Sequence, residues 1–216
     1  VSQKYLLLYP NQYLNNTISI RLGLIMMTIA PLTVSSINMV RSKLIQELQH
    51  IIAHDELTSS LTRRQLIQSI QILQQQAKDS AQTTAFIMLD IDHFKQVNDN
   101  YGHQIGDRAL QSCVHTIQAL LKPHDLLGRL GGEEFAIFMS NTDTVTAYHC
   151  AEKIREKISQ TPIALEHQDY FYIQISVGLY ICKPENQQSI EYLFKQADDA
   201  LYQAKRQGRN QVVIST

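Results

Sequence analysis

The sequence predicts an α+β fold in which helices pack on a mixed, largely antiparallel sheet. Ala85–Leu89 is a continuous apolar run that ends abruptly in Asp90, as a central strand buried on both faces does. The short apolar runs Leu126–Leu127 and Phe135–Met139 lie on either side of Gly131–Gly132, which is the pattern of a β-hairpin. Segments with helical spacing alternate with these strands, so helices are expected to cover the sheet.

Four segments place apolar residues at the spacing of an amphipathic helix. Two more segments, Tyr172–Ile181 and Gln211–Ile214, are strand-like, and Gly208 is predicted to cap the last helix at its C-terminus. The helical stripes are Leu66, Ile70 and Leu73; Leu110, Cys113, Val114, Ile117 and Leu121; Tyr148, Ala151, Ile154 and Ile158; and Ile190, Leu193, Phe194, Ala197, Leu201 and Ala204.

The composition favours one globular domain with a short extension. The chain has 216 residues, of which 44% are hydrophobic, and this is enough for a real core. The net charge of -1 does not favour a general nucleic-acid binder, which needs a basic surface. The cysteines Cys113, Cys150 and Cys182 form no C-x-x-C pair, so reduced thiols are expected rather than a zinc site or a disulfide framework.

The N-terminal region, residues 1–54, contains an uncharged run from Leu22 to Val40. As a helix this run is about 28 Å long, close to the hydrocarbon thickness of a bilayer. Arg41 and Lys43 follow at once, which predicts a transmembrane segment at 22–40 with the C-terminal side in the cytoplasm at the inner membrane. Pro31 and several polar residues leave a buried or partner-packed helix as the alternative.

A helix at 41–54 is expected to link this run to the folded domain. Ile37, Leu44, Leu48 and Ile51 recur at heptad-like spacing, which favours a signalling helix that pairs with a copy of itself. An ordinary amphipathic helix is the alternative. The compact domain is predicted to span 55–216.

Acidic residues at strand ends are the first indication of chemistry. Asp90 ends the buried strand, and Glu133 and Glu134 follow two glycines in the hairpin. A carboxylate at such a position is costly unless it is paired, hydrogen-bonded or bound to metal, and carboxylates suit Mg²⁺. A solvated acidic turn is the alternative. The chain has neither a G-x-x-x-x-G-K-[ST] loop nor a G-x-G-x-x-G turn, so any nucleotide would be bound by another route.

Several ordered segments resemble the motifs of the GGDEF domain family. The opening motif corresponds to Asp55–Thr58 with Arg63–Arg64, and the closing motif to Tyr202–Lys205 with Gly208–Asn210. The central segments are Asp90–Asp99, Gly102–His103, Gly106–Asp107 and Gly131–Phe135. The resemblance implies a palm-like sheet domain similar to nucleotide cyclases, and diguanylate cyclase activity, which joins two GTP molecules into cyclic di-GMP.

The resemblance also implies the roles of individual residues. Asp90 and Glu133, with the backbone carbonyl of Ile91, would bind Mg²⁺ or Mn²⁺, and Glu133 matches the family's proposed proton acceptor. Glu134 would bind a second metal or only shape the turn. Asn98 and Asp107 would recognise guanine, since a carboxylate can accept from both N1–H and the N2 amino group. The other implied substrate-binding positions are Phe94, Lys95, His103, Arg129, Lys205 and Arg209.

Most of these positions also have a purely structural explanation. Lys205 and Arg209 are cations of the kind favoured near a helix C-terminus. His103 could be a helix N-terminal residue without a further role, and Lys95 could pair with a nearby acid. Asp92 and Asp99 are expected to be structural or hydrogen-bonding residues rather than ligands.

The two-fold symmetry of cyclic di-GMP implies a homodimer with one GTP bound in each half. The alternative function is a catalytically silent, GTP-binding regulatory module. Where many members of the family carry an Arg-x-x-Asp product-inhibition site, this chain has Lys122 and Asp125. Lysine cannot make a bidentate contact, so weak product inhibition is expected. Ser59, Ser60 and Thr62 also depart from the family pattern, in the opening motif.

Overall fold

The chain forms two compact units, Val1–His50 and Ile51–Thr216. The computed structural model describes residues 53–165, 169–184 and 188–215, together with helical residues between 16 and 43. The predicted domain boundary at residue 55 lies four positions inside the second unit.

In the first unit the residues 34–41 are helical, and Ile37 and Val40 are exposed. Among the residues described, no helix is both long enough and apolar enough to span a bilayer. Of the predicted span, positions 23, 25, 26 and 28–33 lie outside the described residues, as do Leu44, Leu48 and Ile51 of the predicted pairing helix. The transmembrane segment and the pairing helix therefore stay predictions.

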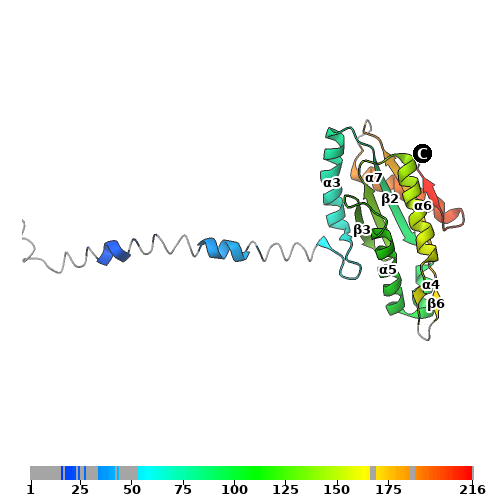
Figure 1. Ribbon diagram of the computed structural model, residues 1–216, viewed down its shortest axis with the longest axis horizontal. Helices are drawn as coiled ribbons and strands as arrows, with labels where there is room; N and C mark the ends of the chain where they lie inside the picture. Colours follow the sequence, from blue (N-terminus) through cyan, green and yellow to red (C-terminus); the bar gives the residue numbers. More distant parts are fainter. Residues whose placement is uncertain are drawn as a thin grey trace, which may run out of the picture. The chain divides into compact units, whose positions relative to one another are not determined.

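The second unit is built on a six-stranded mixed sheet, as the sequence predicts (Figure 1). The central strand β2 (Thr84–Ile91) pairs antiparallel with both β4 (Glu134–Met139) and β7 (Ile175–Cys182). Beyond β4 lie β3 (Leu126–Gly131), antiparallel to it, and β1 (Leu61–Thr62), parallel to β3. On the other edge β8 (Val212–Ile214) runs parallel to β7.

Helices cover both faces of this sheet. The apolar sides of α5 (His103–Gln118) and α6 (Thr144–Gln160) pack on one face, and those of α3 (Arg63–Asp79) and α7 (Ile190–Arg206) on the other. Side-chain caps fix the beginnings of two of these helices: Asp143 accepts from the Thr146 N–H at α6, and Ser189 accepts from the Tyr192 N–H at α7.

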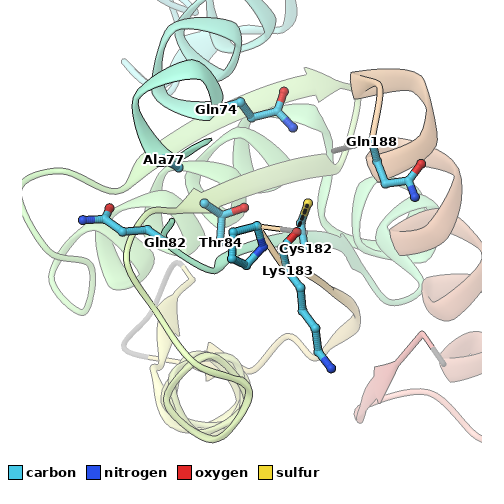
Figure 2. A pocket seen from close by; sticks show the side chains of 8 residues that line it. Gln74, Ala77, Gln82, Thr84, Cys182, Lys183 and Gln188 are labelled. Carbon is cyan, nitrogen blue, oxygen red and sulfur yellow. Dashed lines mark hydrogen bonds between the residues drawn. The ribbon is translucent and has the colours of Figure 1, made fainter. Parts of the chain in front are cut away.

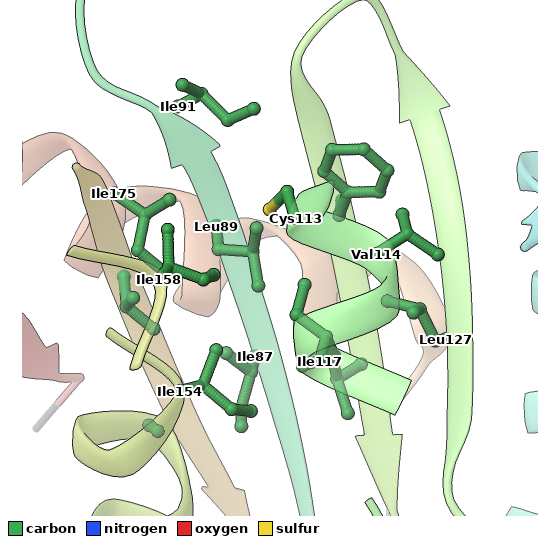
Figure 3. Packing of buried hydrophobic residues seen from close by; sticks show 14 of the residues in the cluster. Ile87, Leu89, Ile91, Cys113, Val114, Ile117, Leu127, Ile154, Ile158 and Ile175 are labelled. Carbon is green, nitrogen blue, oxygen red and sulfur yellow. The ribbon is translucent and has the colours of Figure 1, made fainter. Parts of the chain in front are cut away.

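The core confirms that β2 is buried on both faces, because all eight of its residues are buried. Ile87, Leu89 and Ile91 point toward α5 and α6, as Figure 3 shows. Phe86 and Met88 belong to the cluster under α3 and α7. This alternation also decides the direction of Asp90, which falls on the same face of the strand as Phe86 and Met88.

Two elements differ from the sequence prediction. The predicted strand Tyr172–Ile181 starts too early: β7 begins at Ile175, and Tyr170–Phe171 is a separate strand β6, paired with β5 (Ile163–Ala164). The helix α4 (Phe94–Tyr101) was not predicted, because it buries only Phe94 and its sequence therefore has no apolar stripe. The capping role predicted for Gly208 is confirmed: it directly follows the C-cap residue Gln207 with φ +119, the position and backbone form of a glycine that ends a helix.

Candidate active site

The acidic residues meet where β2 ends beside the β3–β4 hairpin. Asp90 lies opposite Glu134 in the antiparallel register, and the Ile91 N–H donates to the Glu133 carbonyl over 3.4 Å. Asp90 is only 7% exposed, Glu133 is half-buried and Glu134 is exposed. Antiparallel pairing thus brings carboxylates 43 and 44 positions apart in sequence to one edge of the sheet.

Arg129 holds the tip of this hairpin. Gly132 turns the chain with φ +51, a conformation that favours glycine, and its carbonyl accepts from Arg129 Nε at 3.0 Å and Nη2 at 2.8 Å. Arg129 Nη1 donates to both carboxylate oxygens of Asp55, at 3.0 and 3.2 Å. In this structure the guanidinium braces the hairpin against the opening motif. A contact of Arg129 with substrate stays a prediction.

The Asp55 carboxylate is stabilised in its charged form. Burial alone would raise its pKa, but hydrogen bonds from the Thr58 hydroxyl and the Arg129 guanidinium, with the Thr58 N–H and the charge of Arg129, outweigh burial and lower the pKa. Ser60, one of the departures from the family pattern, contacts the Thr58 hydroxyl at 2.8 Å. The altered opening motif therefore still forms a closed hydrogen-bonded turn.

Asp90 has the opposite balance. Burial raises its pKa most, and the charges of Glu133 and Glu134 raise it further, against the ion pair with Lys205, which lowers it. The Lys205 Nζ lies 2.8 Å from Asp90 Oδ2. The last turns of α7 therefore bring a cation into direct contact with the acid at the strand end. The general preference for cations near a helix C-terminus does not by itself explain this contact.

The Asp92 carboxylate is engaged in hydrogen bonds within the fold, as expected from the sequence. Asp92 is 6% exposed, and its carboxylate accepts from the Ser176 hydroxyl at 2.7 Å and from the Asn210 N–H at 3.0 Å. Arg209 Nε lies 4.0 Å from the same carboxylate, so a second cation of the closing motif is held beside the strand end. The sequence places Asn210 in the closing motif without a role and does not single out Ser176. The tolerance of asparagine for left-handed backbone is the signal that could have drawn attention to Asn210.

The predicted guanine-binding residues lie on α4 and α5. Asn98 is half-buried on α4, and Asp107 is exposed in the second turn of α5, with His103 exposed at the first residue of that helix. Gly106 lets the two helices meet, because a Cβ there would collide with the Asn98 side-chain oxygen and come within 3.3 Å of the Phe94 ring. Lys95 is exposed beside buried Phe94.

The degenerate inhibition site is a separate turn. The Lys122 N–H donates to the Asp125 carboxylate at 2.9 Å, and the Asp125 N–H donates back to the Lys122 carbonyl at 3.0 Å. Burial raises the pKa of Asp125, against the contacts with Lys122 and His124 that lower it. These two residues precede β3 and are not brought to the carboxylate cluster.

One cavity lies beside the acidic end of β2, and another lies at its opposite end. A cavity of about 380 Å³ lies beside Glu134, lined by Arg63, Met88, Leu130, Phe194, Lys195 and Asp198. Figure 2 shows a second one, of about 30 Å³, which includes Thr84 and Cys182. Thr84 starts β2 and Asp90 is six residues on, so roughly 20 Å separates the second cavity from the acids. It is too small and too remote to be part of the same site.

The donor set at the acids is suited to a hard cation shared with substrate. Within the described ranges no three His, Cys, Asp or Glu side chains cluster closely enough to hold a metal ion by themselves. Asp90 and Glu133 offer two carboxylates, and a divalent cation would offset both the burial and the carboxylate repulsion that raise the pKa of Asp90. Mg²⁺ usually takes one or two carboxylates and completes its shell with water and phosphate. The residues present fit such an ion.

Comparison with known proteins identifies the family. The sequence model described as "Diguanylate cyclase, GGDEF domain" matches residues 52–211. Diguanylate cyclase DgcM of Escherichia coli K12 is 36% identical over 175 residues, which cover 81% of this chain and 41% of DgcM. A diguanylate cyclase of Vibrio cholerae is 34% identical over 169 residues, 78% of this chain and 51% of the relative. The chain thus spans about half the length of these curated relatives, or less.

Solved structures agree with this match. The GGDEF domain of DgcB from Caulobacter crescentus, in complex with c-di-GMP, has a TM-score of 0.71 and 30% identity, and the match covers 76% of this chain and 93% of that one. The active GGEEF domain of a diguanylate cyclase from Vibrio cholerae has a TM-score of 0.66 and 35% identity, with 72% and 97% covered. The chain therefore belongs to the GGDEF family of diguanylate cyclase domains.

Proposed function

We propose that this protein is an active diguanylate cyclase that condenses two GTP into cyclic di-GMP and two pyrophosphate. The observation that carries the proposal is the intact acidic cluster: Asp90 at the end of β2, with Glu133 and Glu134 in the adjoining hairpin. The cations Lys205 and Arg209 at the end of α7 supply the charge that a triphosphate needs. The likeness to the active GGEEF domain, which has the same acidic signature, supports it.

Selection of guanine is assigned to Asn98 and Asp107. The exposed Asp107 carboxylate would accept from guanine N1–H and the N2 amino group, two donors that adenine does not present on that edge. Asn98 would add an amide contact from α4. An Asp107→Ser variant is therefore expected to lose GTP preference and to gain use of ATP, measured as the ratio of kcat/KM for the two nucleotides.

The residues around Asp90 prepare the reaction. Asp90, Glu133 and the Ile91 carbonyl would hold the divalent ion, Mg²⁺ or Mn²⁺. When bound, the ion would neutralise the triphosphate and lower the pKa of the attacking hydroxyl. Lys205 and Arg209 would orient the phosphates, and Glu133 would accept the proton of the 3′-hydroxyl.

In each half-reaction one 3′-oxygen forms a bond to the α-phosphorus of the other GTP. The bond from that phosphorus to the bridging oxygen of the β-phosphate breaks, and pyrophosphate leaves. Two such steps close the ring, so two half-sites must face each other across a two-fold axis. We therefore propose a homodimer in which each subunit binds one GTP.

The N-terminal helix is the proposed means of pairing and of anchoring. Val34, Ile37 and Val40 are exposed in their helical segment and offer apolar side chains to a partner or to lipid. A structure of the coiled coil and GGDEF domain of DgcB, at a TM-score of 0.78 and 28% identity over 86% of this chain, supports pairing through such a helix. Specific activity is then expected to rise with protein concentration until the dimer is saturated.

Incubation of the full chain with GTP and Mg²⁺, followed by chromatography, tests the activity. Cyclic di-GMP that appears with two equivalents of pyrophosphate supports the cyclase. Bound GTP without product, at a protein concentration where sedimentation shows a dimer, would instead support the silent regulatory module.

A further inference from the structure

Asp92 lies near the acidic cluster, and its carboxylate is almost completely enclosed by the fold. Its side chain is 2% exposed, and each carboxylate oxygen has an assigned partner. Oδ1 accepts from the Ser176 hydroxyl on the neighbouring strand β7, and Oδ2 accepts from the backbone N–H of Asn210, beyond the end of α7. A carboxylate so engaged is poorly placed to bind an ion or a substrate itself.

The segment that Asp92 contacts has an unusual backbone. Gly208, Arg209 and Asn210 follow one another with φ of +119, +65 and +43. Only glycine enters this region without steric cost, so Arg209 must be held there by its surroundings. The Asp92 carboxylate meets the Asn210 N–H from the sheet side, and Arg155 Nη1 on α6 donates to Asn210 Oδ1 at 3.0 Å.

Arg209 leaves this turn in a defined direction. Its backbone N–H donates to the Ala204 carbonyl at 3.0 Å, and its Nε lies 4.0 Å from Asp92 Oδ1. The side chain is nevertheless 44% exposed. A guanidinium that faces a buried carboxylate with its Nε still has the edge between its two terminal nitrogens, and that edge can meet a phosphate.

We propose that Asp92 is a positioning residue for the triphosphate: it holds the Arg209–Asn210 turn in its left-handed form and orients the Arg209 guanidinium toward the phosphates. The inference rests on the proposed function, because it takes GTP as the ligand of Arg209. It assigns to Asp92 a role that neither metal coordination nor core packing supplies. Ser176 and Arg155 support it from the two neighbouring elements.

A double-mutant cycle on nucleotide affinity tests the proposal. The full chain is titrated calorimetrically with a GTP analogue that has a methylene group between the α- and β-phosphorus atoms, in Mg²⁺ buffer. Asp92→Asn preserves the shape of the side chain and an acceptor oxygen for the Ser176 hydroxyl. It removes the negative charge, so Asn210 and Arg209 face an NH₂ group or a neutral oxygen in place of the carboxylate. We expect Asp92→Asn and Arg209→Ala each to weaken binding by about tenfold, as the loss of a charge-assisted contact does.

The decisive value is the affinity of the double variant. If Asp92 acts through Arg209, the double variant binds about as weakly as Arg209→Ala alone, since the residue to be oriented is gone. Multiplied effects, about a hundredfold together, would overturn the proposal, as would parental affinity in Asp92→Asn. If the parent itself does not bind the analogue, the proposed function fails, and the inference fails with it.

A second pair of variants covers the case in which Asp92→Asn does not fold, as judged by circular dichroism. Asn210→Gly and Asn210→Val both remove the amide contact with Arg155, but only valine resists a positive φ. We expect Asn210→Val to lose more affinity for the analogue than Asn210→Gly. Equal losses in the two variants would contradict the positioning role of the turn.

Discussion

At the scale of one residue, the Asp90 carboxylate lowers the stability of the fold at a position where the proposed reaction needs its charge. Burial at the strand end and repulsion from Glu133 and Glu134 raise its pKa, and the Lys205 ammonium offsets them only in part. A raised pKa in the folded state means that the charged form is disfavoured by folding, so the carboxylate costs stability above its ordinary pKa and not below it. The proposed metal site would require this charge.

Asp90→Asn is therefore expected to stabilise the metal-free protein at neutral pH and to abolish cyclase activity. The neutral amide avoids the repulsion, and Lys205, one-third exposed, can turn to solvent. Thermal unfolding in EDTA should show a higher Tm for the variant at pH 7 than for the parent. The advantage should shrink as the pH falls and the parent's Asp90 takes up its proton. A lower Tm at pH 7 would show that the Lys205 ion pair outweighs burial.

We expect Lys122 to determine how strongly cyclic di-GMP inhibits the enzyme. The Lys122 main chain is already fixed by Asp125, so the turn is formed and only the guanidinium fork is missing. Lys122→Arg is expected to strengthen inhibition by cyclic di-GMP by about tenfold, the gain of one bidentate contact. Inhibition curves at fixed GTP would measure it, with Lys122→Gln as the control. Strong inhibition of the parent by micromolar product would contradict the account.

At the scale of elements, Arg129 ties the opening turn to the hairpin that carries the acids. The folded pKa of Asp55 lies below its ordinary value of 3.8, since hydrogen bonds from Thr58 and Arg129 exceed the opposing effect of burial. Its contribution to stability is thus present above pH 3.8 and is lost as the pH falls through the lower folded pKa.

Asp55→Asn should accordingly lower the free energy of unfolding at pH 7, with a difference from the parent that fades below about pH 4. Urea unfolding between pH 7 and pH 3 measures this difference. In an Arg129→Met background the effect of Asp55→Asn should be smaller, because one of its partners is absent. A difference that is independent of pH would show that the Asp55 charge does not stabilise the fold.

The packing of α7 on β7 decides where Lys205 and Arg209 lie. A Cβ at Gly178 would collide with the Ala197 carbonyl and the Leu201 backbone of α7. Gly178→Ala is expected to destabilise the domain by about 1–3 kcal/mol and to lower GTP affinity, because the helix must move off the sheet. Chemical unfolding measures the first effect, with Gln203→Ala on the exposed side of α7 as a control within about 0.5 kcal/mol of the parent. Unchanged stability in Gly178→Ala would show that α7 can shift without cost.

At the scale of the whole molecule, the sequence predicted the mixed sheet, the hairpin and the longer helices, because long apolar stripes report burial directly. Leu66, Ile70 and the whole of β2 are buried as expected. The short helix α4 and the start of β7 were missed because their positions depend on tertiary contacts: α4 buries one side chain, and Tyr172 is an exposed residue with high strand propensity.

The candidate site divides in the same way. Motif positions placed Asp90, Glu133 and Lys205 in one site, and the structure brings Lys205 within 2.8 Å of Asp90. The hydrogen bonds of Arg129 with Asp55 and Gly132, and that of the Asn210 N–H with Asp92, were not readable from the sequence, because they depend on partners that folding brings from distant segments.

The most direct test of the central claim compares Glu133→Gln with Glu134→Gln in the full chain, supplied with GTP and Mg²⁺. Both changes remove one negative charge from the same hairpin, but only Glu133 is proposed to hold metal and to accept the proton of the 3′-hydroxyl. We expect cyclic di-GMP from the parent, none above background from Glu133→Gln, and a smaller loss in Glu134→Gln. Parental rates of product formation in Glu133→Gln would contradict it.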